Sequence, residues 1–302
     1  MIEVLDVTAR DGLQNEKRMF STSEKLDLIT RAVTAGAKRL EIASFAHPKY
    51  VPQMADAEAV IEGVERIPDV TYIGLVMNAR GLDRALKTKI DEIGFVVVAS
   101  DTFAQKNQNQ TCQGSVDLAC ELIARAKQAG LSTNVTIAAS FGCPFDGEVP
   151  EGLVVDMAKQ LSGAKPREIS IADTIGVGNP WHVKSLVSKL REELPDMPLR
   201  GHFHNTRNTG LANSYAAIEA GITTLDVSIG GIGGCPFAPA ATGNIPSEDL
   251  IYMLERNGIK TGMHLEHVIQ TAQWLSEKME HALPGMVSKA GGFPASSKIA
   301  AK

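Results

Sequence analysis

Two histidines are the residues whose type and spacing most directly suggest chemistry in this chain. His202 and His204 stand two apart in the stretch GHFHNT, residues 201–206, of a chain with seven histidines. Alternate residues of a β-strand point to one face, so both imidazoles would project from the same side and Gly201 and Phe203 from the other. Such a pair can clamp a metal ion. An isolated His-x-His can also be a packing or surface pair, so the other polar residues decide between the two.

Further polar side chains lie at or near the ends of apolar runs. They are Arg10 and Asp11 after the first run, Glu41 within the second, Asp173 at the end of a later one and Asn244 after the last. If these runs are parallel strands, their carboxyl ends meet at one edge, where such folds place their chemistry. On their own, Arg10 could be a salt-bridged loop residue and Glu41 a barrel-wall carboxylate paired to a base.

A mixed set of metal donors follows from this placement. Asp11, His202, His204 and Asn244 would supply one carboxylate, two imidazoles and one amide oxygen. Oxygen and nitrogen donors without a thiolate suit Mg²⁺, Mn²⁺ or a related divalent ion and leave positions open for a substrate. We therefore expect a catalytic metal rather than a structural one.

A glycine-rich segment, residues 230–244, carries a second signal. It holds five glycines and the dipeptide Cys235-Pro236, so it can approach a ligand closely and move. A thiol in such a flap over a cationic site is placed to donate or take a proton, and we predict this role for Cys235. The scattered Cys112, Cys120 and Cys143 are predicted to be inert thiols.

The elements that must position these residues are eight short apolar runs. They are IEVLDV, RLEIAS, TYIGLVM, IGFVVVA, STNVTIAA, EISIAD, LRGHFH and TLDVSIG, separated by stretches with helical spacing. Eight strand-helix units over about 250 residues predict an α/β fold of the (β/α)8 TIM-barrel type. An open doubly wound sheet is the alternative, but no Gly-x-Gly-x-x-Gly turn follows the first run. Closure would bring the first strand beside the eighth.

Length and composition restrict the class further. The 302 residues, 44% of them hydrophobic, suit one barrel domain over residues 1–285, with a small-residue tail at 286–302 that is expected to be mobile. A net charge of −5 without a basic stripe argues against nucleic acid as a partner. No apolar run reaches the roughly 18 residues of a membrane span, and no cleavable leader is apparent, which predicts a cytoplasmic protein without membrane contact.

Several motifs together resemble the 3-hydroxy-3-methylglutaryl-CoA lyase family, part of a metal-dependent barrel group with the isopropylmalate and homocitrate synthases. The likeness runs from about Glu3 to Leu275. Its landmarks are RDGLQNE (10–16), EIASFAHPKYVPQM (41–54), QKN (105–107), GCPFDG (142–147), ADTIGVGNP (172–180), HFHNT (202–206), GGCPFAPAATGN (233–244) and EDLIYMLERNGIKTG (248–262).

The resemblance implies an activity and roles for single residues. It implies cleavage of a 3-hydroxy-3-alkylglutaryl thioester to acetyl-CoA and a 3-oxo acid such as acetoacetate, with the metal on the four donors named above. Arg10 would then stabilise the enolate oxygen, Cys235 would protonate the acetyl-CoA carbanion, and Glu41 would stand beside the metal. Either Asp11 or His202 could accept the proton of the tertiary alcohol.

Three residues depart from the family pattern. Members often read His-Cys-His-Asp-Thr-Tyr-Gly, whereas Phe203, Asn205 and Arg207 stand at the variable places here. Arg207 adds a cation near the site, which suggests a substrate with a different alkyl or acid portion, such as a longer-chain 3-hydroxyglutaryl-CoA or a citramalyl-type thioester. Neutral drift is the alternative explanation.

Three other functions share parts of this pattern. A Claisen-condensing enzyme of the isopropylmalate or homocitrate synthase type would resemble a longer chain and lack the Gly-Gly-Cys-Pro loop. A metal hydrolase barrel would carry His-x-His on its first strand, and a barrel used only for binding would not need metal, arginine and thiol together.

Substrate contacts and assembly are less specified by the sequence. Lys49, Lys106 and Asn107 are the candidates for contacts to the CoA portion of the acyl-CoA substrate. Barrels of this type usually assemble, so a homo-oligomer, a dimer or larger, is expected.

Overall fold

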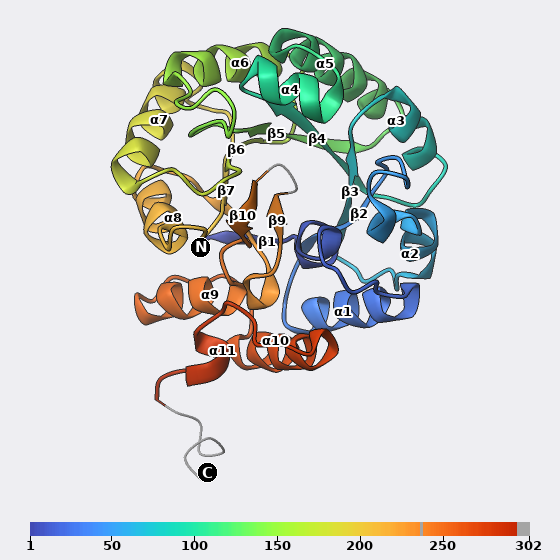
Figure 1. The fold of residues 1–302 in the computed structure, drawn as a ribbon, viewed down its shortest axis with the longest axis vertical. Coiled ribbons are helices and arrows are strands. Elements are labelled where there is room, and N and C mark those ends of the chain that lie inside the picture. Colours follow the sequence, from blue (N-terminus) through green and yellow to red (C-terminus); the bar gives the residue numbers. More distant parts are fainter. Residues whose placement is uncertain (236–237, 295–302) are drawn as a thin grey trace.

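A closed ring of eight parallel strands forms the centre of the molecule (Figure 1). The computed structural model describes residues 1–235 and 238–294, without the side chains of residues 235–242. The strands are β1 Glu3–Asp6, β2 Arg39–Ser44, β3 Thr71–Val76, β4 Glu92–Val98, β5 Ser132–Ala138, β6 Ile169–Asp173, β7 Leu199–Phe203 and β8 Thr224–Val227. Seven fall within the predicted runs, and β4 begins one residue before its run, at Glu92. Because β1 pairs with both β2 and β8, the TIM barrel is confirmed and the open sheet is wrong.

Helices surround this ring on its outer side (Figure 1). They are α1 Thr22–Thr34, α2 Ala57–Gly63, α3 Ala79–Ala85, α4 Asp101–Gln108, α5 Cys112–Gln128, α6 Glu151–Gly163, α7 Pro180–Glu193, α8 Gly210–Glu219, α9 Ser247–Arg256, α10 Leu265–Met279 and α11 Val287–Ala290. Local sequence sets their starts: at α1, Ser21 and Glu24 form a capping box in which each side chain accepts from the other's backbone N–H. None of the helices in the described residues is long and apolar enough to cross a membrane.

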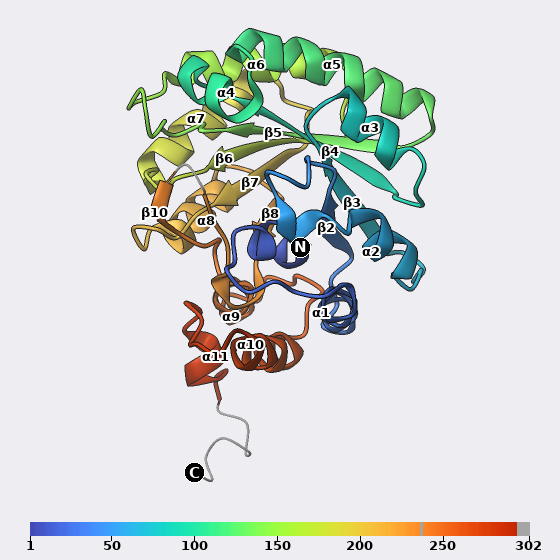
Figure 2. The same cartoon turned by 45° about the vertical axis from the view of Figure 1, so that its right-hand side comes forward.

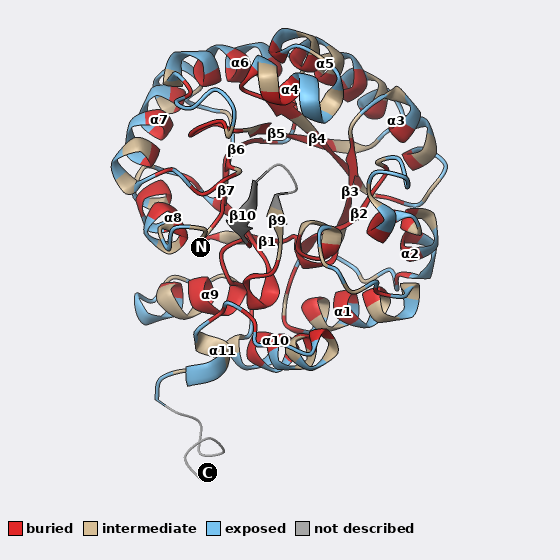
Figure 3. Cartoon of the chain, in the orientation of Figure 1, coloured by how far each residue is buried: buried red, intermediate tan, exposed pale blue. Residues whose placement is uncertain are grey.

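The main apolar core lies between the ring and the helices, whose outer faces are exposed (Figure 3). The interior of the barrel is different. Leu5, Val7 and Ile73 form a small separate apolar cluster. Much of the remaining interior at the amino-terminal end of the strands holds paired charges rather than the branched apolar layers common in such barrels.

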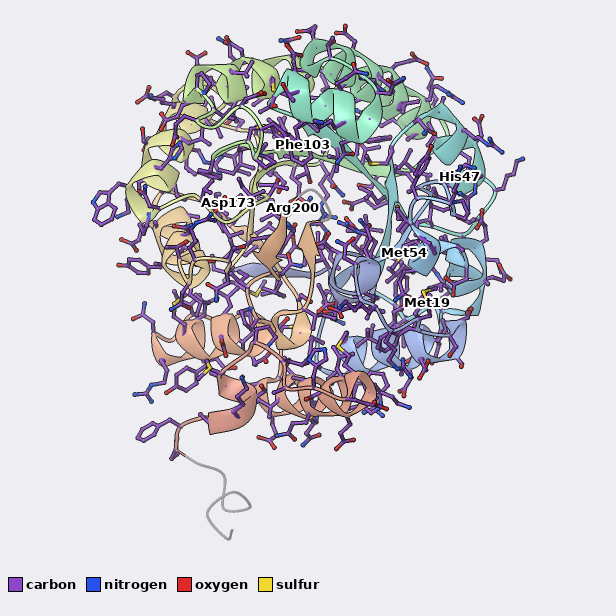
Figure 4. The ribbon with its side chains drawn as sticks, viewed as in Figure 1. Met19, His47, Met54, Phe103, Asp173 and Arg200 are labelled. Atoms are coloured by element: carbon purple, nitrogen blue, oxygen red, sulfur yellow. The ribbon has the colours of Figure 1, made fainter. Side chains whose placement is uncertain are left out.

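Arg39 is central to these paired charges. Its guanidinium lies 2.7 Å from Glu92 and 2.8 Å from both Glu168 and Glu3, and only 2% of its side chain is exposed. Glu168 also contacts Arg200 at 3.0 Å, and Arg200 lies inside the ring of strands (Figure 4). The network thus extends across the barrel and continues toward the carboxyl ends of the strands.

Two irregular elements lie at that carboxyl end. A single π-helical turn, Thr8–Gly12, follows β1, and such turns often mark functional sites. The short strands β9 Gly234–Cys235 and β10 Ala238–Thr242 pair antiparallel and are drawn across the middle of the ring in Figure 1, with β10 at the left of Figure 2.

The first part of the predicted tail, residues 286–302, contains the helix α11. Asp249 accepts backbone hydrogen bonds from Met286 and Val287, which start α11, at 2.7–3.1 Å. Residues 295–302 lie outside the described part of the chain. The predicted mobility of the tail therefore concerns residues that the structure does not describe, and it stays a prediction.

The Arg39 network yields a prediction about stability. Replacement of Arg39 by Met removes the nearest cation of the fully buried Glu92 and one of the two cations on Glu168, and we expect a loss of about 3–5 kcal/mol in the free energy of unfolding. Urea unfolding followed by circular dichroism measures it. The control Lys89→Met removes an exposed ion pair with Glu62 and should cost less than about 1 kcal/mol. Equal losses in the two variants would contradict the role given to Arg39.

Candidate active site

Three of the predicted metal donors converge at the carboxyl end of the barrel. One donor atom from each of Asp11, His202 and His204 lies within 4.8 Å of the other two. The Nε2 atoms of the two histidines are 3.1 Å apart, and His204 Nε2 lies 4.0 Å from Asp11 Oδ2. Octahedral ligands at about 2.1 Å from an ion stand about 3 Å from their neighbours, so the spacing suits one divalent cation.

Asn244, the fourth predicted donor, lies beside these three. A β-bridge joins it to His204, and its Nδ2 donates to Asp11 Oδ2 at 2.8 Å and to the carbonyl of Ile232 at 3.2 Å. Its buried Oδ1 accepts no hydrogen bond from any described residue. A buried amide oxygen without a donor is costly, and a cation would satisfy it. The residues present therefore fit a metal ion.

The π-helical turn directs Arg10 and Asp11 into this end of the barrel. Arg10 Nη1 donates to Asp11 Oδ1 at 2.7 Å, and Arg10 Nε donates to Glu41 Oε1. Glu41 sits on β2 and is 4% exposed. The sequence placed all three residues together, and the structure does so by holding the arginine between two carboxylates.

The surroundings set the protonation of the donors. Burial alone would raise the pKa of Asp11, but Arg10 and the two histidines lower it to about 2, so the group is a carboxylate. Burial and the charge of His202 lower the pKa of His204 to about 4, which keeps that imidazole neutral. For His202, burial is outweighed by the bond to Asp226, and the pKa is raised above its usual value.

Asp226 is a functional candidate that the sequence analysis missed. Its Oδ2 lies 3.0 Å from His202 Nδ1, and its Oδ1 lies 3.3 Å from Arg200 Nε. Both partners stand on β7, beside Asp226 on β8. An ionisable residue inside an apolar run was the signal that singled out Glu41, and the same signal is present in TLDV (224–227) and LRGH (199–202).

Buried charge in the barrel interior also favours a cation. The acids Glu41, Glu92, Glu168 and Asp226 are buried there with the arginines Arg10, Arg39 and Arg200, and Asp11 stands at the carboxyl end of the strands. Uncompensated charge is expensive in a low-dielectric interior. A divalent ion at the Asp11 and histidine cluster would add positive charge beside the Asp11 carboxylate.

The glycine-rich segment passes directly beside a predicted ligand. Gly233 has φ +126°, and a Cβ on it would lie 2.6 Å from Asn244 Nδ2. Asn15 Nδ2 donates to the carbonyl of Gly234 at 2.7 Å, which ties the segment to the loop after β1. Cys235 lies on β9, but its side chain is outside the described part of the structure, so its role stays a prediction.

The side chains of the three residues that depart from the family pattern contact other parts of the protein. Phe203 is fully buried against Phe141, with ring centroids 5.9 Å apart, and so faces away from the histidines as predicted. Asn205 Oδ1 accepts from the backbone of Gly210. Arg207 Nη1 donates to the carbonyls of Ile175 and Gly176 at 3.0 and 2.8 Å. The Arg207 guanidinium thus joins two loops.

Asp173 likewise shapes a loop. Its carboxylate accepts backbone hydrogen bonds from Val177 and Gly178 at 2.9 and 3.0 Å, and it lies within the left part of the ring in Figure 4. The three candidate CoA contacts, Lys49, Lys106 and Asn107, are exposed residues after β2 and on α4, and their role stays a prediction.

Comparison with known proteins decides the family. The HMGL-like family matches residues 1–275. The chain belongs to the HMGL-like family. It is 39% identical to the hydroxymethylglutaryl-CoA lyase YngG of Bacillus subtilis, over 94% of this chain and 95% of that protein. It is 38% identical to the (R)-citramalyl-CoA lyase of Chloroflexus aurantiacus, over 96% and 95%.

Solved structures of HMGL-like proteins agree with this assignment. An HMG-CoA lyase of Acinetobacter baumannii, in complex with coenzyme A and 3-methylmalate, superposes with a TM-score of 0.93 at 38% identity, covering 97% of this chain and 96% of that one. The HMG-CoA lyase of Bacillus subtilis also gives 0.93, covering 96% and 97%. The family resemblance drawn from the sequence is confirmed.

The raised pKa of His202 leads to a prediction about metal binding. Below that pKa the ring carries a second proton, which competes with a cation for Nε2, so the affinity for Mn²⁺ should fall with decreasing pH by up to about tenfold per unit. Isothermal titration in buffers of different ionisation enthalpy measures the released proton. The control His264→Gln should keep this dependence, whereas a pH-independent affinity would contradict it.

Close packing of Gly233 on Asn244 leads to a second prediction. Gly233→Ala should displace the Asn244 amide and weaken Mn²⁺ binding by about tenfold or more. Electron paramagnetic resonance of free Mn²⁺ measures the affinity. Gly258→Ala also places a side chain at positive φ, with φ +71° and open space around the new Cβ, and should bind Mn²⁺ normally. A similar loss in both variants would show that only backbone strain matters.

Proposed function

We propose that this chain is a divalent-metal-dependent carbon-carbon lyase. Its substrate is 3-hydroxy-3-methylglutaryl-CoA or a close 3-hydroxy-3-alkylglutaryl or citramalyl-type CoA thioester, which it cleaves to acetyl-CoA and an oxo acid such as acetoacetate. The observation that carries the proposal is the convergence of Asp11, His202 and His204 beside Arg10, in a chain that matches lyases over nearly its whole length.

The reaction breaks one carbon-carbon bond. The tertiary hydroxyl loses its proton, its oxygen becomes a carbonyl, and the bonding electron pair leaves with the thioester carbon as an enolate. When bound, a divalent ion supplies Lewis-acid chemistry that lowers the pKa of this hydroxyl. Asp11 accepts the proton, because a carboxylate that binds an ion through one lone pair keeps others free, whereas a His202 that donates from Nδ1 to Asp226 and binds the ion through Nε2 has none.

Arg10 and Cys235 act on the departing enolate. A guanidinium offers a charged fork to the developing oxyanion, and the bond from Arg10 Nε to Glu41 fixes its direction. Cys235 then delivers a proton to the enolate carbon, which gives acetyl-CoA. Its position in the glycine-rich segment beside Asn244 supports this assignment.

The donors favour Mg²⁺ or Mn²⁺ as the ion. The predicted donors are one carboxylate, two imidazoles and one amide oxygen, which are hard or borderline ligands. No thiolate belongs to the cluster found among the described residues. Asp11, His202, His204 and Asn244 would hold the ion. We further propose an acyl-CoA substrate held partly by the strand-end loops, and a homo-oligomeric assembly.

A citramalyl-type substrate is the second candidate. It is favoured by the 38% identity to the (R)-citramalyl-CoA lyase, which nearly equals the identity to the Bacillus lyase. The earlier reason for a different substrate is weaker, because Arg207 engages backbone carbonyls. A Claisen-condensing enzyme is less well supported, because the two relatives named above are lyases and the match to this chain covers 95% of each of them.

An activity assay tests the proposal. Metal-stripped protein should be inactive on HMG-CoA and recover with Mg²⁺ or Mn²⁺, releasing acetyl-CoA and acetoacetate. Arg10→Gln should lower kcat by about 10²- to 10³-fold, since it removes the charged donor to the oxyanion. Arg18→Gln, which breaks an outer ion pair with Glu24, should keep the activity.

Two outcomes bear on the substrate. A higher kcat/KM on citramalyl-CoA, with pyruvate in place of acetoacetate, would assign the second candidate. Undiminished turnover after exhaustive chelation, or no cleavage of any of these thioesters with either metal, would contradict the proposed function.

A further inference from the structure

Asp226 contacts Nδ1 of His202, the ring nitrogen that does not face the other predicted metal donors. We propose that Asp226 is a positioning residue that holds the proton of His202 on Nδ1 and thereby leaves the Nε2 lone pair directed at the metal ion. This inference rests on the proposed function only in that the cluster binds a divalent cation. It concerns a residue that touches neither the ion nor the substrate.

Strand geometry places the two side chains together. Strands β7 and β8 pair in parallel with Arg200 opposite Thr224 and Gly201 opposite Leu225, so His202 stands beside Asp226 on the next step of the ladder. Asp226 Oδ2 lies 3.0 Å from His202 Nδ1. An ionised carboxylate can only accept a hydrogen bond, so the ring donates from Nδ1.

The carboxylate itself is held in place from the opposite side. Arg200 Nε lies 3.3 Å from Asp226 Oδ1, and the same guanidinium contacts Glu168 at 3.0 Å and donates to Thr136 Oγ1 at 3.0 Å. Arg200 and Asp226 are 2% and 4% exposed. Because Arg200, Asp226 and Thr136 stand on barrel strands, the carboxylate has little freedom to follow the ring if the ring turns.

The consequence falls on the other ring nitrogen. With Nδ1 donating to Asp226, His202 Nε2 faces His204 Nε2 at 3.1 Å and the carboxylate of Asp11. A carboxylate that accepts a hydrogen bond from a metal-binding histidine, without itself binding the metal, orients the ring and raises its basicity. Loss of such a carboxylate typically costs about 10- to 100-fold in metal affinity.

A purely structural role is the competing explanation. Asp226 could serve only to neutralise Arg200. Glu168 offers the matched control, because it is an equally buried carboxylate on the same guanidinium and its ion pairs within the described residues are with arginines rather than with a histidine.

Two variants and one affinity measurement separate these explanations. Asp226→Asn can donate an amide N–H to Nδ1, which favours the tautomer with the proton on Nε2. We expect its dissociation constant for Mn²⁺, measured by electron paramagnetic resonance, to rise about 10- to 100-fold. Glu168→Gln should bind Mn²⁺ within about threefold of the unaltered protein. Equal weakening in both variants would overturn the proposal, as would an unchanged affinity in a folded Asp226→Asn protein.

The unaltered protein provides a test that does not depend on how the variants fold. In ¹⁵N-histidine-labelled protein with Mg²⁺ added, His202, assigned by comparison with His202→Gln, should show a proton on Nδ1 and none on Nε2. The opposite tautomer would overturn the proposal.

Neither measurement uses turnover. A protein that cleaves none of the tested thioesters and still shows the Asp226 effect on Mn²⁺ would contradict the proposed function while supporting the role of Asp226.

Discussion

Closure of the strand ring is the constraint on which the site depends. Strand β1 pairs with β8 along its whole length, from Glu3 opposite Thr224 to Asp6 opposite Val227. That pairing brings Asp11, at the start of the chain, to within a hydrogen bond of Asn244, which is 233 positions downstream. An open sheet would leave these two groups on opposite edges, so the donor cluster exists only because the sheet is closed.

The position of His202 also depends on a network of buried charges inside the barrel. Arg39, Glu168, Arg200 and Asp226 link one another from the amino-terminal end of the strands to His202. Arg39, Arg200 and Asp226 stand on strands, and Glu168 directly precedes β6, so their backbones cannot shift independently. Rigid buried networks of this kind are costly to form, and they suit a site where ligands must stay within a few tenths of an ångström.

Strand positions and the metal donors could be predicted from the sequence, whereas the charged interior could not. Period-2 spacing shows that His202 and His204 share a face, and the strand order places Asp11 beside them. A run such as TLDV shows that Asp226 is unusual but not which strand faces it, because partners across a barrel are set by register. The contacts of Arg207 depend on loop conformation, so its proximity to the site in sequence suggested a role in substrate choice that its carbonyl partners do not support.

The base of the β9 and β10 segment is attached at several points to the ligand framework. Gly233 packs on Asn244, Gly234 accepts from Asn15, and Gly243 accepts from the backbone of Asn205. Insertions or deletions between these anchors would change the reach of the segment over the barrel mouth without moving the groups at its root. The length of the segment between its anchors is therefore free to change separately from the position of Asn244.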